Sequence, residues 1–133
     1  MTRRPEPGGD AGGPLVALCV GHRCAALRRL AGTADGVDRV AEAVRHTTGA
    51  VLVTAGCVGA CDRAALAGLA WREPGSDRAG PAVWLSEVQT PERTDGLVAW
   101  VSAGRPGVAG PTTGLPDCLR TVVAGVGPAP RLG

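Results

Sequence analysis

Apolar and polar residues follow one another along the chain in blocks that predict a mixed α/β fold. Two short continuous apolar runs, residues 14–19 (PLVALC) and 50–55 (AVLVTA), are typical of buried strands. Residues 35–47 lie between them and predict an amphipathic helix. The apolar residues of that helix recur at the spacing of one buried stripe, namely Val37, Val40, Ala41 and Val44.

The second half of the chain predicts two more strands and a well-marked helix. Residues 64–71 and 81–88 read as strands, although the Ala and Leu content of the first is equally compatible with a helix. Thr90-Pro91-Glu92 is typical of a helix start, because Thr caps the helix and Pro is preset for its first position. We expect this helix to end near Ala103. Residues 25–31 and 115–126 predict further short helices.

These elements predict an α/β fold with a small mixed sheet of about four strands and flanking helices. The order β-α-β-β-β-α begins with a strand, a crossover helix and a second strand, which form a right-handed unit with parallel strands. The two later strands can then pair antiparallel. We expect a flexible tail over residues 1–13, one domain over 14–104, and a C-terminal extension over 105–133.

The composition argues against some classes of function and favours metal or redox chemistry. The 133 residues carry a formal net charge of +2 and no basic run or aromatic stacking platform, which argues against nucleic-acid binding. No segment reaches the roughly 18 apolar residues of a membrane span, and no secretory signal is evident, so we expect a cytoplasmic protein. In that compartment five cysteines indicate metal or redox chemistry rather than structural disulfides.

Each predicted parallel strand leads directly into a pair of cysteines. Cys19 and Cys24 are separated by four residues, and Cys57 and Cys61 by three. Because parallel strands of a βαβ unit end at the same edge of the sheet, the two loops should meet there and bring four thiolates to one site. Four thiolates suit either tetrahedral Zn²⁺ or an iron–sulfur cluster.

The spacing of the cysteines favours the cluster. Structural zinc sites usually have two-residue gaps, whereas wider gaps suit an object that spans two irons. Glycines at Gly21, Gly56 and Gly59 would let the backbone approach a cluster closely and aim N–H groups at its sulfurs.

The two cysteine motifs resemble those of the thioredoxin-like [2Fe–2S] ferredoxins. The resemblance rests on CVGHRC (residues 19–24) and GCVGAC (56–61), and more weakly on PAVWL (81–85) and WVSAG (100–104). It implies a thioredoxin-like ferredoxin fold, and it implies that the four cluster ligands are Cys19, Cys24, Cys57 and Cys61. It also implies one-electron transfer to a redox partner protein and raises a homodimer as an expectation, because such ferredoxins are often dimers. The chain departs from many of these proteins at Asp62-Arg63, where they have a Gly-Pro turn.

Other interpretations remain open at this point. The cysteines could bind zinc in an interaction module, deliver a cluster or metal in a cofactor pathway, act as a thiol switch, or be buried small hydrophobic residues. Arginines close to the ligand loops are either a solvated rim or a docking patch for an acidic partner, namely Arg23, Arg28, Arg29 and Arg63. Cys118 and His22 are not expected to be ligands. No catalytic motif is evident, so we expect a carrier rather than an enzyme.

Overall fold

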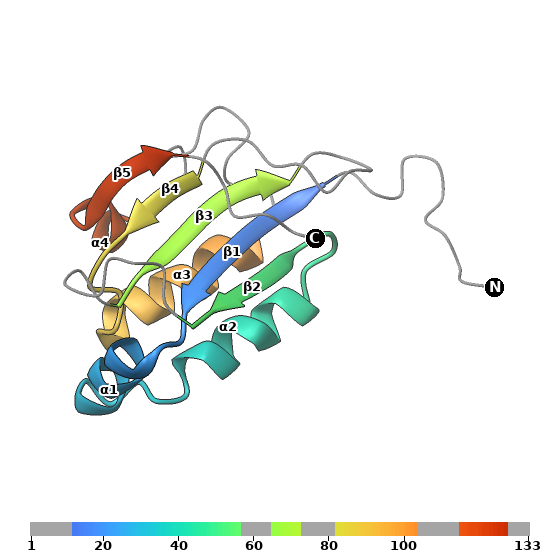
Figure 1. The fold of residues 1–133 in the computed structure, drawn as a ribbon. Coiled ribbons are helices and arrows are strands. Elements are labelled where there is room, and N and C mark those ends of the chain that lie inside the picture. The colour runs from blue at the N-terminus through green and yellow to red at the C-terminus, as the bar shows by residue number, and fades with distance from the viewer. Residues whose placement is uncertain (1–11, 57–64, 73–81, 104–114, 128–133) are drawn as a thin grey trace.

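A computed structural model of the chain describes residues 12–56, 65–72, 82–103 and 115–127. Within these residues the chain forms one five-stranded mixed sheet and four helices (Figure 1). The strands are β1 (Gly13–Cys19), β2 (Val51–Ala55), β3 (Ala67–Arg72), β4 (Ala82–Leu85) and β5 (Val123–Gly127). The helices are α1 (His22–Leu30), α2 (Gly36–Arg45), α3 (Pro91–Ala103) and α4 (Asp117–Arg120). The predicted tail lies outside the described residues, apart from Gly12 and Gly13.

The sheet has the strand order β2-β1-β3-β4-β5. β1 and β2 run parallel, with Cys19 opposite Ala55, while β3 pairs antiparallel with β1 and β4 antiparallel with β3. The predicted parallel unit and the antiparallel pairing of the later strands are therefore confirmed. The third strand is also confirmed. The alternative that residues 64–71 form a helix is wrong for the residues from Ala67 onward.

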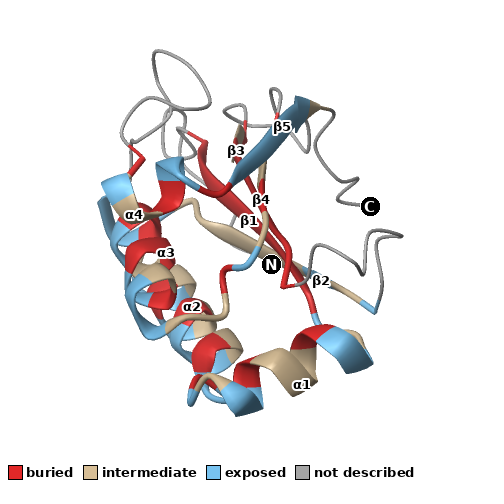
Figure 2. Cartoon of the chain, turned by 90° about the vertical axis from the view of Figure 1, so that its left-hand side faces the viewer, coloured by how far each residue is buried: buried red, intermediate tan, exposed pale blue. Residues whose placement is uncertain are grey.

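Helices α2 and α3 cover one face of the sheet and enclose the main core (Figures 1 and 2). Because side chains of a strand alternate between faces, Val16 and Leu18 of β1 join this core while Leu15 belongs to a cluster on the opposite face. In α2, Val40 and Ala43 are buried, whereas the predicted stripe residues Val37, Ala41 and Val44 are only half-buried. The stripe is thus turned slightly from its predicted position.

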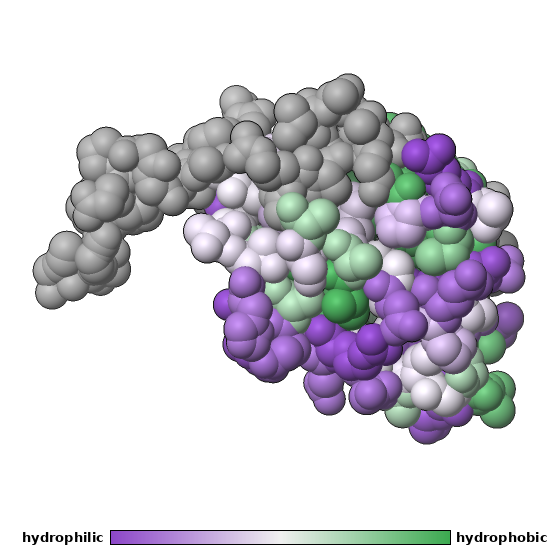
Figure 3. Space-filling view, turned by 180° about the vertical axis from the view of Figure 1, so that it is seen from behind, coloured by the Kyte–Doolittle hydropathy of each residue, from purple (hydrophilic) through white to green (hydrophobic). Residues whose placement is uncertain are grey.

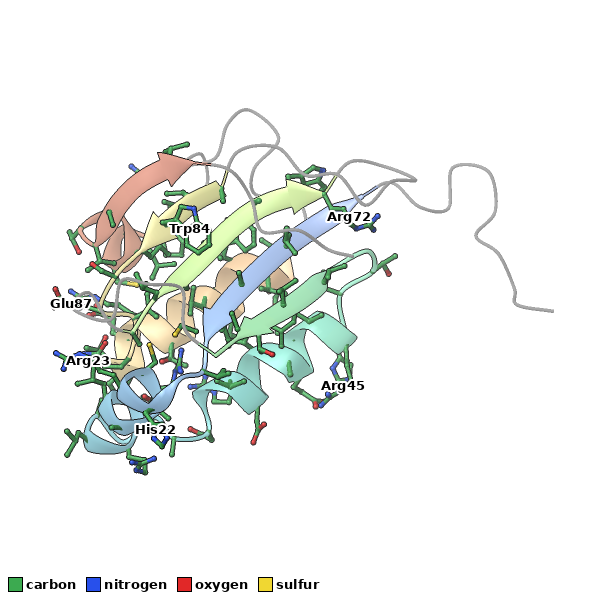
Figure 4. The ribbon with its side chains drawn as sticks, in the orientation of Figure 1. His22, Arg23, Arg45, Arg72, Trp84 and Glu87 are labelled. Atoms are coloured by element: carbon green, nitrogen blue, oxygen red, sulfur yellow. The ribbon has the colours of Figure 1, made fainter. Side chains whose placement is uncertain are left out.

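The opposite face of the sheet carries a smaller apolar cluster, in which Trp84 lies over β3 (Figure 4). Gly68 of β3 is paired with Trp84 of β4 and leaves room for the indole ring. A Cβ atom at Gly68 would come within 2.7 Å of that ring. Of the three tryptophans, Trp100 is buried, while Trp71 and Trp84 are half-buried.

The C-terminal segment differs from the prediction. Instead of a helix over residues 115–126, it forms the single turn α4 and then the strand β5, which pairs antiparallel with β4. The sequence of β5, VAGVG, combines β-branched residues with two glycines that weaken a helix, and the open edge of β4 supplies its hydrogen-bonding partner. The sheet therefore has five strands rather than about four.

Helix α3 begins as predicted. The Thr90 side-chain oxygen accepts a hydrogen bond from the amide of Arg93 over 3.2 Å, and Pro91 is the first helical residue. Seen from the helix side, the described surface is mainly hydrophilic (Figure 3). In the part of the chain that the structure describes, no helix is long and apolar enough to cross a membrane.

Candidate metal centre

The predicted metal site lies at the sheet edge where β1, β2 and β4 end and β3 begins. The register of the strands sets this edge, because Cys19 is opposite Ala55 and Leu85 is opposite Ala67. Helix α1 follows β1 directly and packs at the same edge (Figure 1). Chain segments that are far apart in the sequence thus meet around the end of β1.

Cys19 is the last residue of β1 and is 4% exposed. Its amide nitrogen donates a hydrogen bond to the carbonyl oxygen of Leu66 over 3.1 Å, and its Sγ lies 3.8 Å from the carbonyl oxygen of Gly56. The first described residues on either side of the two remaining cysteines are Gly56 and Ala65. Cys19 therefore contacts Gly56 through its side chain and Leu66 through its backbone, and these two residues lie on either side of residues 57–64.

Cys24 belongs to a helix rather than to a loop. A helix was expected only from residue 25, but α1 begins at His22, so Cys24 is its third residue. The first i→i−4 hydrogen bond joins the Ala25 amide to the Gly21 carbonyl oxygen over 2.9 Å. The amides of the three preceding residues have no acceptor within the helix, and they give the start of α1 a partial positive charge beside the thiol.

The two described cysteines of the site are close to each other and buried. Cys24 is 1% exposed, and neither it nor Cys19 forms a disulfide. Burial, followed by a hydrogen bond with the Cys19 side chain, raises the pKa of the Cys24 thiol, whereas a hydrogen bond from the Leu66 backbone opposes the rise. A raised pKa favours the neutral thiol of Cys24, which would have to lose its proton to bind a metal.

Arg28 is a residue of the site that the sequence placed differently. The sequence groups it with arginines expected to form a solvated rim or a docking patch, and Arg23 and Arg29 are indeed exposed, with Arg23 projecting from the first turn of α1 (Figure 4). Arg28 itself is only 6% exposed, and its Nη1 donates a hydrogen bond to the carbonyl oxygen of Cys19 over 2.9 Å. Burial lowers the pKa of its guanidinium, while the charges of Cys24 and Cys19 as thiolates act in the opposite direction.

The other predicted ligands, Cys57 and Cys61, lie outside the described residues, as does Gly59. Gly56 is described and exposed, and a Cβ atom placed on it would meet nothing within 4 Å. Gly21 precedes α1 as its N-cap. No three potential ligands among the described His, Cys, Asp and Glu residues form a group that could hold a metal ion.

Gln89, which the sequence gave no reason to select, connects three segments at this edge. Its side-chain oxygen accepts a hydrogen bond from the Ala65 amide over 3.2 Å, and its carbonyl oxygen accepts one from the buried Thr33 hydroxyl over 2.6 Å. The Val88 amide adds a third link by donating to the Ala65 carbonyl oxygen over 3.1 Å. These bonds fix the start of the chain that leaves residues 57–64.

Cys118 and His22 have other surroundings. Cys118 lies in α4 with its Sγ 3.5 Å from the carbonyl oxygen of Glu92, and burial raises the pKa of its thiol. It therefore packs against α3. Among the described residues, no hydrogen bond joins it to Cys19 or Cys24. His22 is exposed at the start of α1 (Figure 4).

No protein-family model and no curated protein sequence matches the chain. The resemblance to thioredoxin-like ferredoxins therefore rests on the cysteine and tryptophan motifs given above.

Proposed function

We propose that the protein is a one-electron carrier that binds a [2Fe–2S] cluster through Cys19, Cys24, Cys57 and Cys61. The observation that carries the proposal is the arrangement at the end of β1. Two buried thiols lie next to each other there, and the residues flanking the other cysteine pair contact Cys19 on either side. Cys57 directly follows Gly56 in the sequence.

The topology supports a thioredoxin-like ferredoxin fold. Two parallel strands joined through the helices α1 and α2 are followed by two antiparallel strands and the helix α3, in agreement with the order expected from the sequence. The fold matters for the proposal because it brings the ends of β1 and β2 together at one edge. Cysteines that follow these two strands then share a site, although more than thirty residues separate Cys24 from Cys57.

The chain contributes ligation, burial and hydrogen-bond donors. The four thiolates would ligate the irons, and the cluster would supply a centre that accepts and returns a single electron. Burial of Cys19 and Cys24 keeps water away from their side of the site. The free amides at the start of α1 stabilise negative charge on thiolates and sulfides, which favours the reduced state.

The proposed partner is a redox protein, and the proposed location is the cytoplasm. Arg23 and Arg29 are exposed on α1 at the site edge, where their charge favours encounters with an acidic surface. Such a partner should transfer electrons more slowly as the salt concentration rises, because exposed charges are screened.

The decisive experiment is the UV–visible and EPR spectroscopy of anaerobically purified protein before and after dithionite, together with iron, sulfide and zinc analysis. We expect absorption bands between roughly 320 and 460 nm that bleach on reduction, and an EPR signal from the reduced state. A colourless protein that contains zinc would instead identify an interaction module. Thiols that remain free of metal after anaerobic reconstitution would contradict any four-thiolate site.

Rapid loss of the cluster to an apoprotein would point to a delivery protein. A direct transfer assay with an apo-ferredoxin distinguishes this function from electron transfer. A carrier should keep its cluster through repeated reduction and oxidation, whereas a delivery protein should pass it on within one incubation.

A further inference from the structure

Arg28 is buried beside the proposed ligands. It lies one helical turn after Cys24 on α1 and is 6% exposed. Its Nη1 donates a hydrogen bond to the carbonyl oxygen of Cys19 over 2.9 Å, which holds the guanidinium at the end of β1. The neighbouring Arg29 on the same helix is exposed.

The charge of Arg28 has no carboxylate partner among the described residues, whose ion pairs all involve other side chains. A guanidinium remains protonated in proteins, and a buried charge without a counter-charge is costly. The groups that interact with it electrostatically are the thiols of Cys24 and Cys19. Among the described residues, neutral thiols would leave the charge uncompensated, whereas metal-bound thiolates would compensate it.

We propose that Arg28 is the built-in counter-charge of the metal centre and that it raises the reduction potential of the bound cluster. This inference rests on the proposed function. Two ferric ions, two sulfides and four thiolates carry two negative charges together. Reduction by one electron from a donor protein or dithionite raises this to three negative charges and leaves the donor oxidised by one electron. A fixed positive charge close by stabilises the reduced state more than the oxidised state.

Burial explains why Arg28 rather than its neighbours should have this effect. Water and salt screen the exposed guanidinium of Arg29, whereas a buried charge acts through a medium of lower dielectric constant. The hydrogen bond to Cys19 also fixes the guanidinium in place.

The test compares three variants in anaerobic redox titrations of the loaded protein. Arg28→Gln removes the charge and keeps a hydrogen-bond donor, Arg28→Lys keeps the charge, and Arg29→Gln is the matched exposed control. We expect Arg28→Gln to lower the equilibrium constant for reduction about tenfold, which is about 59 mV in midpoint potential for a one-electron couple. Arg28→Lys should restore most of that shift, and Arg29→Gln should stay close to the wild type.

A cluster that forms in Arg28→Gln with the wild-type potential would overturn the inference and leave the proposed function intact. Equal potentials for Arg28→Lys and Arg28→Gln would also overturn it, because the charge would then have no effect. If Arg28→Gln cannot hold a cluster, the proposal requires Arg28→Lys to hold one at a near-wild-type potential. Failure of Arg28→Lys to do so would contradict the proposed role of the positive charge. Absence of a cluster from the wild-type protein would refute both proposals.

Discussion

The amide nitrogen of Cys19 donates a hydrogen bond to the carbonyl oxygen of Leu66 over 3.1 Å. This bond ties the last residue of β1 to the chain that follows residues 57–64. On the other side, the Gly56 carbonyl oxygen lies 3.8 Å from the Cys19 Sγ. The segment with the second cysteine pair thus begins and ends next to the first pair, as a four-thiolate site requires.

The first prediction concerns the ligand set. Serine at any one of four positions should remove most of the cluster absorbance and the bound iron, because a serine hydroxyl is a poor replacement for a thiolate. The four variants are Cys19→Ser, Cys24→Ser, Cys57→Ser and Cys61→Ser. Cys118→Ser is the control and should keep a full complement of iron, since its Sγ contacts the Glu92 carbonyl in α3. Iron retained in all four variants would contradict the ligand set.

The second prediction concerns the two glycines that flank Trp84 across the sheet. Gly68 and Gly125 are both paired with Trp84, but a Cβ atom at Gly68 would come within 2.7 Å of the indole ring, whereas one at Gly125 would meet nothing within 4 Å. Gly68→Ala should lower the free energy of unfolding by about 1–3 kcal/mol, the usual cost of overpacking. Gly125→Ala should change it by no more than about 0.5 kcal/mol. Urea unfolding measures both, and equal effects would show that Trp84 moves aside without cost.

The third prediction concerns the Thr33 hydroxyl, which donates to the Gln89 carbonyl oxygen over 2.6 Å and is buried. Thr33→Val should lower the free energy of unfolding by about 1–3 kcal/mol, because the Gln89 carbonyl oxygen loses this donor from the buried Thr33 side chain. The control is Thr47→Val, since the half-buried Thr47 hydroxyl donates to the Ala43 carbonyl oxygen in the last turn of α2, only four residues earlier in the chain. That variant should cost less than about 1 kcal/mol in the same urea titration. The opposite ranking would mean that the Gln89 contact contributes little.

The fourth prediction concerns pH. The hydrogen bond from Arg45, followed by the charge of Arg45, lowers the pKa of Glu42 in the folded protein. A lowered folded pKa stabilises the protein at pH values above the unfolded pKa, and this stabilisation is lost as the pH falls through the folded value. Glu42→Gln should therefore be less stable than the wild type near neutral pH, and the difference should disappear in acid.

The Glu42 difference should be small, because Glu42 and Arg45 are 56% and 65% exposed, and it should shrink further in high salt. Urea titrations at several pH values and two salt concentrations measure it. In an Arg45→Gln background, the same Glu42→Gln substitution should show a much weaker pH dependence. A difference that grows in acid would contradict the sign of the pKa shift.

The sequence by itself determined the elements whose signals are local. The apolar runs that end at Cys19 and near Cys57 predicted β1 and β2, and Thr90-Pro91-Glu92 predicted the start of α3. These signals depend on residues close together in the chain, such as a cap three residues from the amide that it binds. They were sufficient to predict that the two strands leading into the motifs run parallel and end at one edge of a mixed sheet, as β1 and β2 do.

Only the tertiary structure decided those features that depend on contacts between residues far apart in the sequence. β5 forms because β4 offers it a free edge, and no pattern within residues 115–126 shows that edge. Arg28 was expected on the surface because arginine usually lies there, yet the Cys19 carbonyl binds it beneath the site. The burial of a side chain depends on the folded chain around it, and the hydrogen bond that holds the Arg28 guanidinium is made to Cys19 at the end of another element, β1.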